Sequence, residues 1–229
     1  MATMKRRTSK DMNKPQATER TRVRRLPARG RYDRETIVSI LDEALVVHVG
    51  FSVEGQSYVI PTTYVRIEDA LYIHGSAASR MLEIAEAGAP VCATVTLLDG
   101  LVFARSAFHH SMNYRSVVVL GRATLVSDPA EKLSVLAALV DRFASGRSRE
   151  TRAPNALELK ATHVLRLSLN EASAKLREGP PIDDAEDLAV PCWAGVVPLR
   201  AVAQPPRPES ALPDGVEIPS LPAVLRLTS

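Results

Sequence analysis

The sequence predicts a mainly β protein, a β-barrel of antiparallel strands with peripheral helices. Segments rich in Val, Ile and Tyr alternate with short turn signals such as Glu54-Gly55-Gln56, a pattern typical of antiparallel strands. We expect about six strands, because closing that number into a barrel removes exposed sheet edges. No glycine-rich fingerprint joins a strand to a helix, which argues against a doubly wound nucleotide-binding fold.

The first half of the chain reads as one helix followed by a meander. Asp33 is a candidate N-cap for a helix that begins at Arg34 and carries apolar residues on one face. Three strands are predicted over 44–53, 57–67 and 70–74, and a short helix over 78–88 ends at Gly88. Next, we expect a hairpin of strands 90–98 and 101–106, turning at Asp99-Gly100.

The second half begins with a long strand over 114–126. Asp128 then caps a helix with Pro129 at its first position and Glu131 three residues after the cap, so a helix is expected to about residue 143. A polar connection and one last long strand over 162–176 follow. Ten prolines between 180 and 222 predict an irregular segment that wraps the surface or lies against a partner chain.

The excess of basic over acidic residues lies at the N-terminus. Residues 1–34 hold twelve basic and three acidic residues, a net +9, whereas the remainder holds 17 basic and 23 acidic residues. A mildly acidic body lacks the basic face of a nucleic-acid-binding domain, so contacts with nucleic acid are expected to be limited to weak ones from the arm. We predict a disordered basic arm over 1–25, most simply a solubilising tail, a barrel domain over 26–200 and a proline-rich tail over 201–229.

Composition also bounds the location and the redox chemistry. No apolar run reaches the roughly 18 residues of a membrane span, and no secretory signal pattern is present, so a cytoplasmic protein without membrane contact is expected. Cys92 and Cys192 are too few for a disulfide framework and lack metal-ligand spacing, which predicts two buried thiols. No metal site is predicted, since adjacent His109 and His110 would point to opposite faces of an extended chain.

Polar clusters interrupt three otherwise apolar segments. In the first, 61–64, Pro61 removes a ladder donor and confines this position to an edge or a bulge. The second runs from His74 to Arg80 at a helix start, where free N–H groups, hydroxyls and an arginine suit a phosphate, although an ordinary cap with a solvated arginine explains it equally well. The third, Asn113-Tyr114-Arg115-Ser116, opens a buried strand, where each polar group needs a partner.

Together these segments resemble a known family. The stretches "VIPTTYVRIEDALYIHGSAASRMLEI", "PVCATVT" and "NYRSVVVLGRATLVSD" are similar, in order, to the flavin-nucleotide-binding split barrels of the pyridoxamine 5′-phosphate oxidase-like type, in the branch of the nitroimidazole-resistance reductases. The resemblance covers about residues 25–200. It implies an FMN-binding split barrel, a homodimer with FMN in clefts between two chains.

The resemblance also implies cofactor-binding positions, each carried over to a matching residue. Ile60, Pro61, Thr62 and Thr63 would lie along the flavin, with His74 and Gly75 on the adjacent strand. Ser79 and Arg80 would bind the phosphate, with Met81 where the oxidases continue with lysine. Asn113, Tyr114, Arg115 and Ser116 would approach the flavin edge or the partner, which would satisfy their polar groups, and Trp193 would reach the partner's flavin.

The implied function is a flavin-dependent oxidoreductase. It would take electrons from NAD(P)H or another donor to a small acceptor, in the manner of a nitroreductase or a relative of pyridoxamine phosphate oxidase; the redox chemistry belongs to the cofactor. His74 is the candidate catalytic residue, as a proton donor, with a structural hydrogen bond as the alternative. The alternative function is a haem- or flavin-binding protein of the same fold without turnover, for storage, sensing or haem utilisation. A hydrolase is disfavoured because no nucleophile-elbow glycine pattern surrounds Ser106 or Ser111.

Overall fold

The computed structural model of this protein describes residues 17–213, 215–219 and 221. Its strands are β1 (Gly30–Arg31), β2 (Val46–Val53), β3 (Gln56–Ile67), β4 (Ala70–Ser76), β5 (Pro90–Phe103), β6 (Ser111–Arg122), β7 (Thr124–Leu125), β8 (Thr162–Ser168), β9 (Ala172–Arg177) and β10 (Gly195–Pro198). Its α-helices are α1 (Arg34–Glu43), α2 (Arg80–Glu86), α3 (Pro129–Asp141), α4 (Arg147–Glu150) and α5 (Ala156–Ala161). Four short 3₁₀ turns are η1 (Pro27–Arg29), η2 (Ala107–His109), η3 (Leu169–Glu171) and η4 (Ala185–Ala189).

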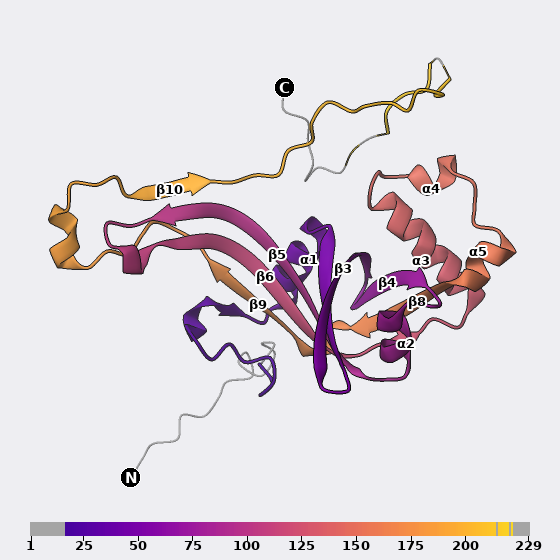
Figure 1. The fold of residues 1–229 in the computed structure, drawn as a ribbon, viewed down its shortest axis with the longest axis horizontal. Helices are drawn as coiled ribbons and strands as arrows, with labels where there is room; N and C mark the ends of the chain where they lie inside the picture. The colour runs from indigo at the N-terminus through magenta and orange to yellow at the C-terminus, as the bar shows by residue number, and fades with distance from the viewer. Residues whose placement is uncertain (1–16, 214, 220, 222–229) are drawn as a thin grey trace, which may run out of the picture.

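The strands form one antiparallel sheet. Their order is β1-β9-β6-β5-β2-β3-β4-β8-β7, with β10 added beside β5. The sheet coils around a core that α1 and α2 share with inward-facing strand residues. The mainly β fold predicted from the sequence is confirmed, including the helices at the periphery of the sheet (Figure 1).

The first hairpin shows how the sequence pattern sets this sheet. Val47, Val49 and Phe51 are buried along β2, while the residues between them face outward. Glu54 and Gly55 join β2 to β3 with φ values of 49° and 82°, the left-handed pair that a two-residue hairpin loop requires. Asp33 caps α1 as predicted, accepting a 2.8 Å hydrogen bond from the Thr36 amide.

The predicted hairpin at Asp99-Gly100 is wrong. A single strand, β5, runs through this point and pairs with β6 along most of its length. A register shift between Leu98 and Gly100 absorbs the extra residue as a bulge, so the Asp-Gly pair bends the strand instead of reversing it. As a result, β5 and β6 form an arm that projects beyond the barrel, with β10 beside β5 (Figure 1).

The predicted single strand over 162–176 is also wrong. It is divided by η3, where the Ser168 hydroxyl accepts a hydrogen bond from the Asn170 amide. The chain changes neighbours at this turn, because β8 pairs with β4 and β9 pairs with β6. The turn thus joins two regions of the sheet that are far apart in strand order.

A second, smaller core lies on the outer face of β4 and β8. Asp128 caps α3 through the amides of Ala130 and Glu131, as predicted. Val135 and Leu139 of α3 then pack against a cluster from the sheet that includes Val164. The polar connection after α3 contains α4, and an Asn155 capping box begins α5.

The N-terminal arm and the proline-rich segment both contain ordered contacts. Of the predicted basic arm over 1–25, residues 1–16 lie outside the described residues. Within residues 17–25, the Val23 amide donates a 2.8 Å hydrogen bond to Tyr32 Oη. In the proline-rich segment β10 is regular structure, contrary to expectation, because its residues pair with the β5 edge and its proline stands at the strand end. The domain limits at 25 and 200 remain predictions.

Two further sequence-based readings can be compared with the structure. Cys192 is exposed on the segment before β10, so the prediction of two buried thiols is wrong for this residue, and Cys92 is only partly buried. None of the helices in the described ranges combines the length and apolar character that a membrane crossing needs.

Candidate functional site

The split of the barrel lies beside residues 60–63 of β3. These residues pair with β2, whereas pairing of β3 with β4 begins only at Tyr64. On its other side β4 continues alongside β8 through His74, Gly75 and Ser76. The segment Ile60–Thr63 is therefore an edge facing the split, which explains why Pro61 is tolerated and leaves backbone groups available to a ligand.

Aromatic stacking connects this edge to the start of α2. The Arg80 guanidinium lies over the Tyr58 ring at 5.4 Å from its centroid, and Tyr58 stacks on Phe51 at 5.6 Å. Ser79 is the N-cap residue of α2, but its hydroxyl makes no capping hydrogen bond. A hydroxyl, a guanidinium and the free N–H groups of a first helical turn thus meet beside β3, a set suited to an anion.

Met81 and Gly75 support this corner through packing. The Met81 side chain is 4% exposed and belongs to the main core, which leaves its backbone N–H as the group that can face a ligand. A Cβ on Gly75 would lie 3.0 Å from Leu82 Cδ1, so glycine allows α2 to pack closely against β4.

The polar cluster on β6 finds partners inside the chain. Arg115 donates to both Glu43 and Asp99, and Ser116 Oγ donates to the Lys175 carbonyl at 3.2 Å. The expectation that a ligand or a second subunit must satisfy these two side chains is therefore wrong, because α1, β5 and β9 supply acceptors.

The first two residues of that cluster lie at the base of the β5–β6 arm. Asn113 is buried, accepts from Arg177 and donates to the Gly179 carbonyl at 3.2 Å. Tyr114 is half-buried and pairs with Leu98 across the arm.

The predicted cofactor residues do not converge within one chain. Strands β2 and β5 lie between β3 and β6 in the sheet, so Ile60–Thr63 and Asn113–Ser116 occupy separate positions. Trp193 is 65% exposed on the arm and packs edge-on against Phe103 at 5.6 Å between ring centroids. The cofactor roles of these residues remain predictions.

A cavity that sequence reasoning missed lies between β4 and the helices α3–α5. Its volume is about 540 Å³, and α3 supplies most of its apolar wall. The lining residues are His74, Leu133, Leu136, Ala137, Leu139, Val140, Phe143, Ser148, Thr151, Arg152, Ala153, Pro154, Glu158 and Thr162. The available signal was a second apolar stripe on α3, since Leu133, Leu136 and Val140 follow helical spacing beside the core stripe of Val135 and Leu139.

His74 lines this cavity from β4. Its Nδ1 is buried without a hydrogen-bond partner among the described residues. Desolvation by burial lowers the pKa of the His74 imidazole, which keeps the ring neutral at pH 7. Its predicted role as a proton donor remains a prediction.

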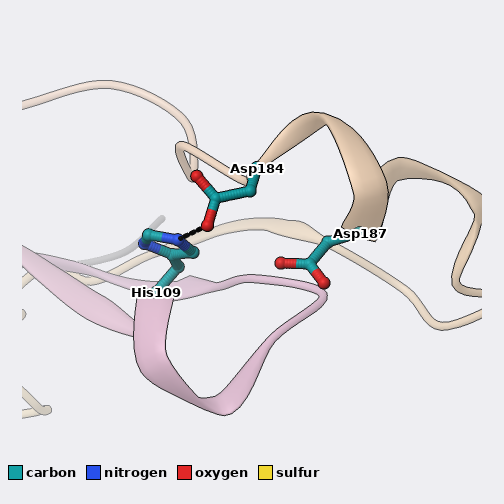
Figure 2. Close-up of side chains that lie close together, drawn as sticks. All are labelled: His109, Asp184 and Asp187. Carbon is teal, nitrogen blue, oxygen red and sulfur yellow. Dashed lines mark hydrogen bonds and ion pairs between the residues drawn. The ribbon is translucent and has the colours of Figure 1, made fainter.

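Three ionisable side chains meet on the arm, where η2 approaches η4 (Figure 2). His109 Nε2 lies 3.0 Å from Asp184 Oδ2, and a hydrogen bond with this carboxylate raises the pKa of His109. Asp187 lies on η4, for which Asp184 is the N-cap residue. One ring nitrogen of His109 and one carboxylate oxygen from each aspartate lie within 4.8 Å of one another. Because Asp184 is 70% exposed, we interpret this contact as a surface ion pair that ties η2 to η4.

Comparison with known proteins now assigns the chain to a family. The family model described as pyridoxamine 5′-phosphate oxidase matches residues 33–176, more than half of the chain. The chain belongs to the pyridoxamine 5′-phosphate oxidase family. The matched region runs from the cap of α1 into β9 and contains β2 to β8 of the sheet.

Two solved structures are similar over most of the chain. The flavocytochrome Anf3 from Azotobacter vinelandii is 45% identical, with a TM-score of 0.85, and the match covers 90% of this chain and 96% of that one. The FAD and heme binding protein from Mycobacterium smegmatis is 38% identical, with a TM-score of 0.79, and the match covers 83% and 94%.

A more distant structure shares the fold. The putative 5-nitroimidazole antibiotic resistance protein from Bacteroides thetaiotaomicron is 22% identical over 64% of this chain and 85% of that one, with a TM-score of 0.55. No curated protein matches the sequence. The family and the split-barrel fold predicted from the sequence are thus confirmed.

Proposed function

We propose that this family member binds a flavin nucleotide and a haem, and that it passes electrons between them. The observation that carries the proposal is the similarity, over 90% and 83% of the chain, to proteins described as a flavocytochrome and as an FAD and heme binding protein. A bound flavin accepts electrons in pairs and releases them singly, which matches a haem that takes one electron at a time.

The residues around the split fit a flavin nucleotide. The unengaged Ser79 hydroxyl, the Arg80 guanidinium and the first N–H groups of α2 would hold a phosphate. The Ile60–Thr63 edge would offer backbone groups to the ring and the ribityl chain. These residues would bind and orient the flavin, and the chain needs no dedicated acid–base pair for hydride transfer from a pyridine nucleotide to the flavin.

The identity of the flavin is a separate question from its presence. FMN is the expectation from the sequence resemblance, whereas the 38% identical relative is described as binding FAD. We propose FAD, since that similarity extends over 83% of the chain. Chromatography of the flavin released by denaturation distinguishes FAD from FMN.

A homodimer is the second part of the proposal. The β5–β6 arm leaves Leu98, Leu101, Met112 and Trp193 exposed, from 36% to 65%, which is the kind of apolar surface that another protein chain covers. A second copy would also place residues of two chains at one flavin. Light scattering is expected to give the mass of two chains, and a monomer that binds flavin fully would refute this part.

The absorbance spectrum of the purified protein tests the function. Flavin bands and a Soret band are expected together, with close to one flavin and one haem per chain after supply of FAD and haemin. Anaerobic NADH or NADPH should then bleach the flavin bands and convert the Soret band to its ferrous form. Protein that fails to take up either one of the two cofactors refutes the proposal, and cofactors that no pyridine nucleotide reduces would favour binding without turnover.

A further inference from the structure

The cavity beside His74 is an apolar space that the described chain leaves open. It lies between β4 and α3, and α4, α5 and their connections form its far side. The helices α3–α5 lie at the end of the molecule away from the β5–β6 arm (Figure 1). At about 540 Å³ it falls within the usual range for a cofactor or small-molecule site. Phe143 in its wall is 53% exposed and Leu133 is 39% exposed, so apolar surface faces solvent where a ligand would cover it.

The alternation of β4 points His74 toward this cavity. Leu71 and Ile73 belong to the main core, whereas Tyr72 belongs to the second core beneath α3. His74 follows Tyr72 by two residues, which places its side chain on the α3 side of the strand. Among the described residues that line the cavity, His74 alone carries an imidazole.

The hydrogen bonding of His74 also points to a ligand. A buried ring nitrogen normally has a hydrogen-bond partner, and Nδ1 of His74 has none in the described chain. Imidazole is the commonest metal ligand among protein side chains.

The other four histidines are placed differently. His48 is exposed on β2. His163 Nδ1 is also buried without a hydrogen bond, but it lies 2.9 Å from the Glu86 carboxylate and outside the cavity lining. His109 and His110 lie on the arm, where they contact Asp184 and the Ser106 carbonyl.

The rim of the cavity carries the polar groups. Arg152 is the cation among the lining residues, and its two terminal nitrogens donate to Glu158 at 2.7 and 3.0 Å. Ser148 and Thr151 add hydroxyls on the same side. A planar apolar macrocycle with carboxylates at one edge matches this division into an apolar wall and a polar rim.

We propose that this cavity is the haem site and that the His74 imidazole would be a ligand of the haem iron. The inference rests on the proposed function, which requires a haem but does not place it. It assigns to His74 a role as a metal ligand in place of the flavin-contact and proton-donor roles expected from the sequence. It also gives a reason for the second apolar stripe of α3, whose members would cover the macrocycle.

The test compares histidine variants of the full chain, supplied with haemin and FAD. His74→Gly is expected to lower the haem content per chain at least about tenfold. Losing a residue that only hydrogen-bonds to a metal ligand already lowers metal affinity by about that factor, and losing the ligand itself should cost more. Flavin per chain should not change. Added imidazole is expected to restore the Soret band in His74→Gly, because the free base can occupy the vacated ligand position. The matched variants His48→Ala and His163→Ala should keep their haem.

A second variant tests the same cavity independently, in case His74→Gly does not fold. Ala137→Phe fills the cavity from α3 while keeping His74, and it should also lose haem and keep flavin. Unchanged haem content and Soret position in His74→Gly would overturn the placement and leave the proposed function intact. A wild-type chain that takes up no haem would instead refute the proposed function itself.

Discussion

The Arg115 guanidinium is held by Glu43, with Nη1 2.5 Å from Oε2 and Nη2 2.8 Å from Oε1. This pair joins the middle of β6 to the last residue of α1, and Asp99 from the β5 bulge accepts from the same guanidinium. The two carboxylates raise the pKa of Arg115, with the Glu43 hydrogen bonds as the larger cause. Arg115 was predicted to bind a ligand, but it instead forms an ion-pair clamp between α1 and the sheet.

Replacing Glu43 should weaken this clamp. In Glu43→Gln one charge-assisted contact is lost, and the free energy of unfolding is expected to fall by about 1 kcal/mol, since the partly exposed pair is screened by solvent. Urea unfolding followed by circular dichroism measures the change. Glu186→Gln makes the same chemical change on exposed η4 and should stay within about 0.5 kcal/mol of wild type; equal losses in both variants would contradict the clamp.

The cap of α1 gives a prediction about acid stability. Asp33→Ala should lower the free energy of unfolding by about 1 kcal/mol at pH 7, because the Thr36 amide loses its acceptor. Hydrogen bonds from Thr36 lower the pKa of Asp33 below 3.8, so its ionised form contributes stability above pH 3.8, and this contribution is lost as the pH falls through the lowered value. Asp33→Asn should keep most of the cap and lose its pH dependence. An Asn variant as unstable as the Ala variant would argue against capping.

Tyr64 gives a prediction about alkaline stability. Its hydroxyl is buried and donates a 2.5 Å hydrogen bond to the Leu41 carbonyl, and burial raises the pKa of Tyr64 from 10.0 to about 12. Between these values the unfolded chain loses the proton and the folded chain keeps it, so stability falls as the pH rises from 10 to 12. Tyr64→Phe should lose about 1 kcal/mol at pH 7 and show a smaller alkaline decline. The comparison is made by urea unfolding at each pH, and an unchanged slope in the variant would exclude Tyr64 as its source.

The anion corner at α2 gives a prediction about flavin affinity. Arg80→Ala should raise the flavin dissociation constant roughly tenfold or more, since a charge-assisted hydrogen bond contributes about 1.5–3 kcal/mol. Fluorescence titration of the flavin-free protein with FAD and with FMN measures this effect. Arg207→Ala removes the same charge from the exposed tail and should leave the constant unchanged. If both variants bind flavin as the wild type does, the phosphate lies elsewhere.

The sequence predicted most local elements correctly, since their causes are local. The cap at Asp33, the turn at Glu54-Gly55 and the Asp128-Pro129 helix start each depend on side chains within a few residues. The Asp99-Gly100 hairpin failed because a two-residue turn signal and a bulge look alike in sequence, and pairing with β6 decides between them.

The sequence predicted which types of residue the candidate site contains, but it predicted fewer of the contacts that these residues make. The edge position of Pro61 followed from the missing amide of proline, and the structure confirms it. The partners of Arg115 could not be predicted, because Glu43 is 72 residues away in the chain. The cavity beside His74 was missed for the same reason, since its walls come from β4, α3 and the α4–α5 connection.

By itself, the sequence determined the strand and helix signals, the family and the types of polar group available to a cofactor. The tertiary structure alone decided which of those groups are already engaged within the chain and which face an open space. The reason is physical: propensity and capping act between neighbours in the chain, whereas hydrogen-bond partners and cavities arise when distant segments pack together.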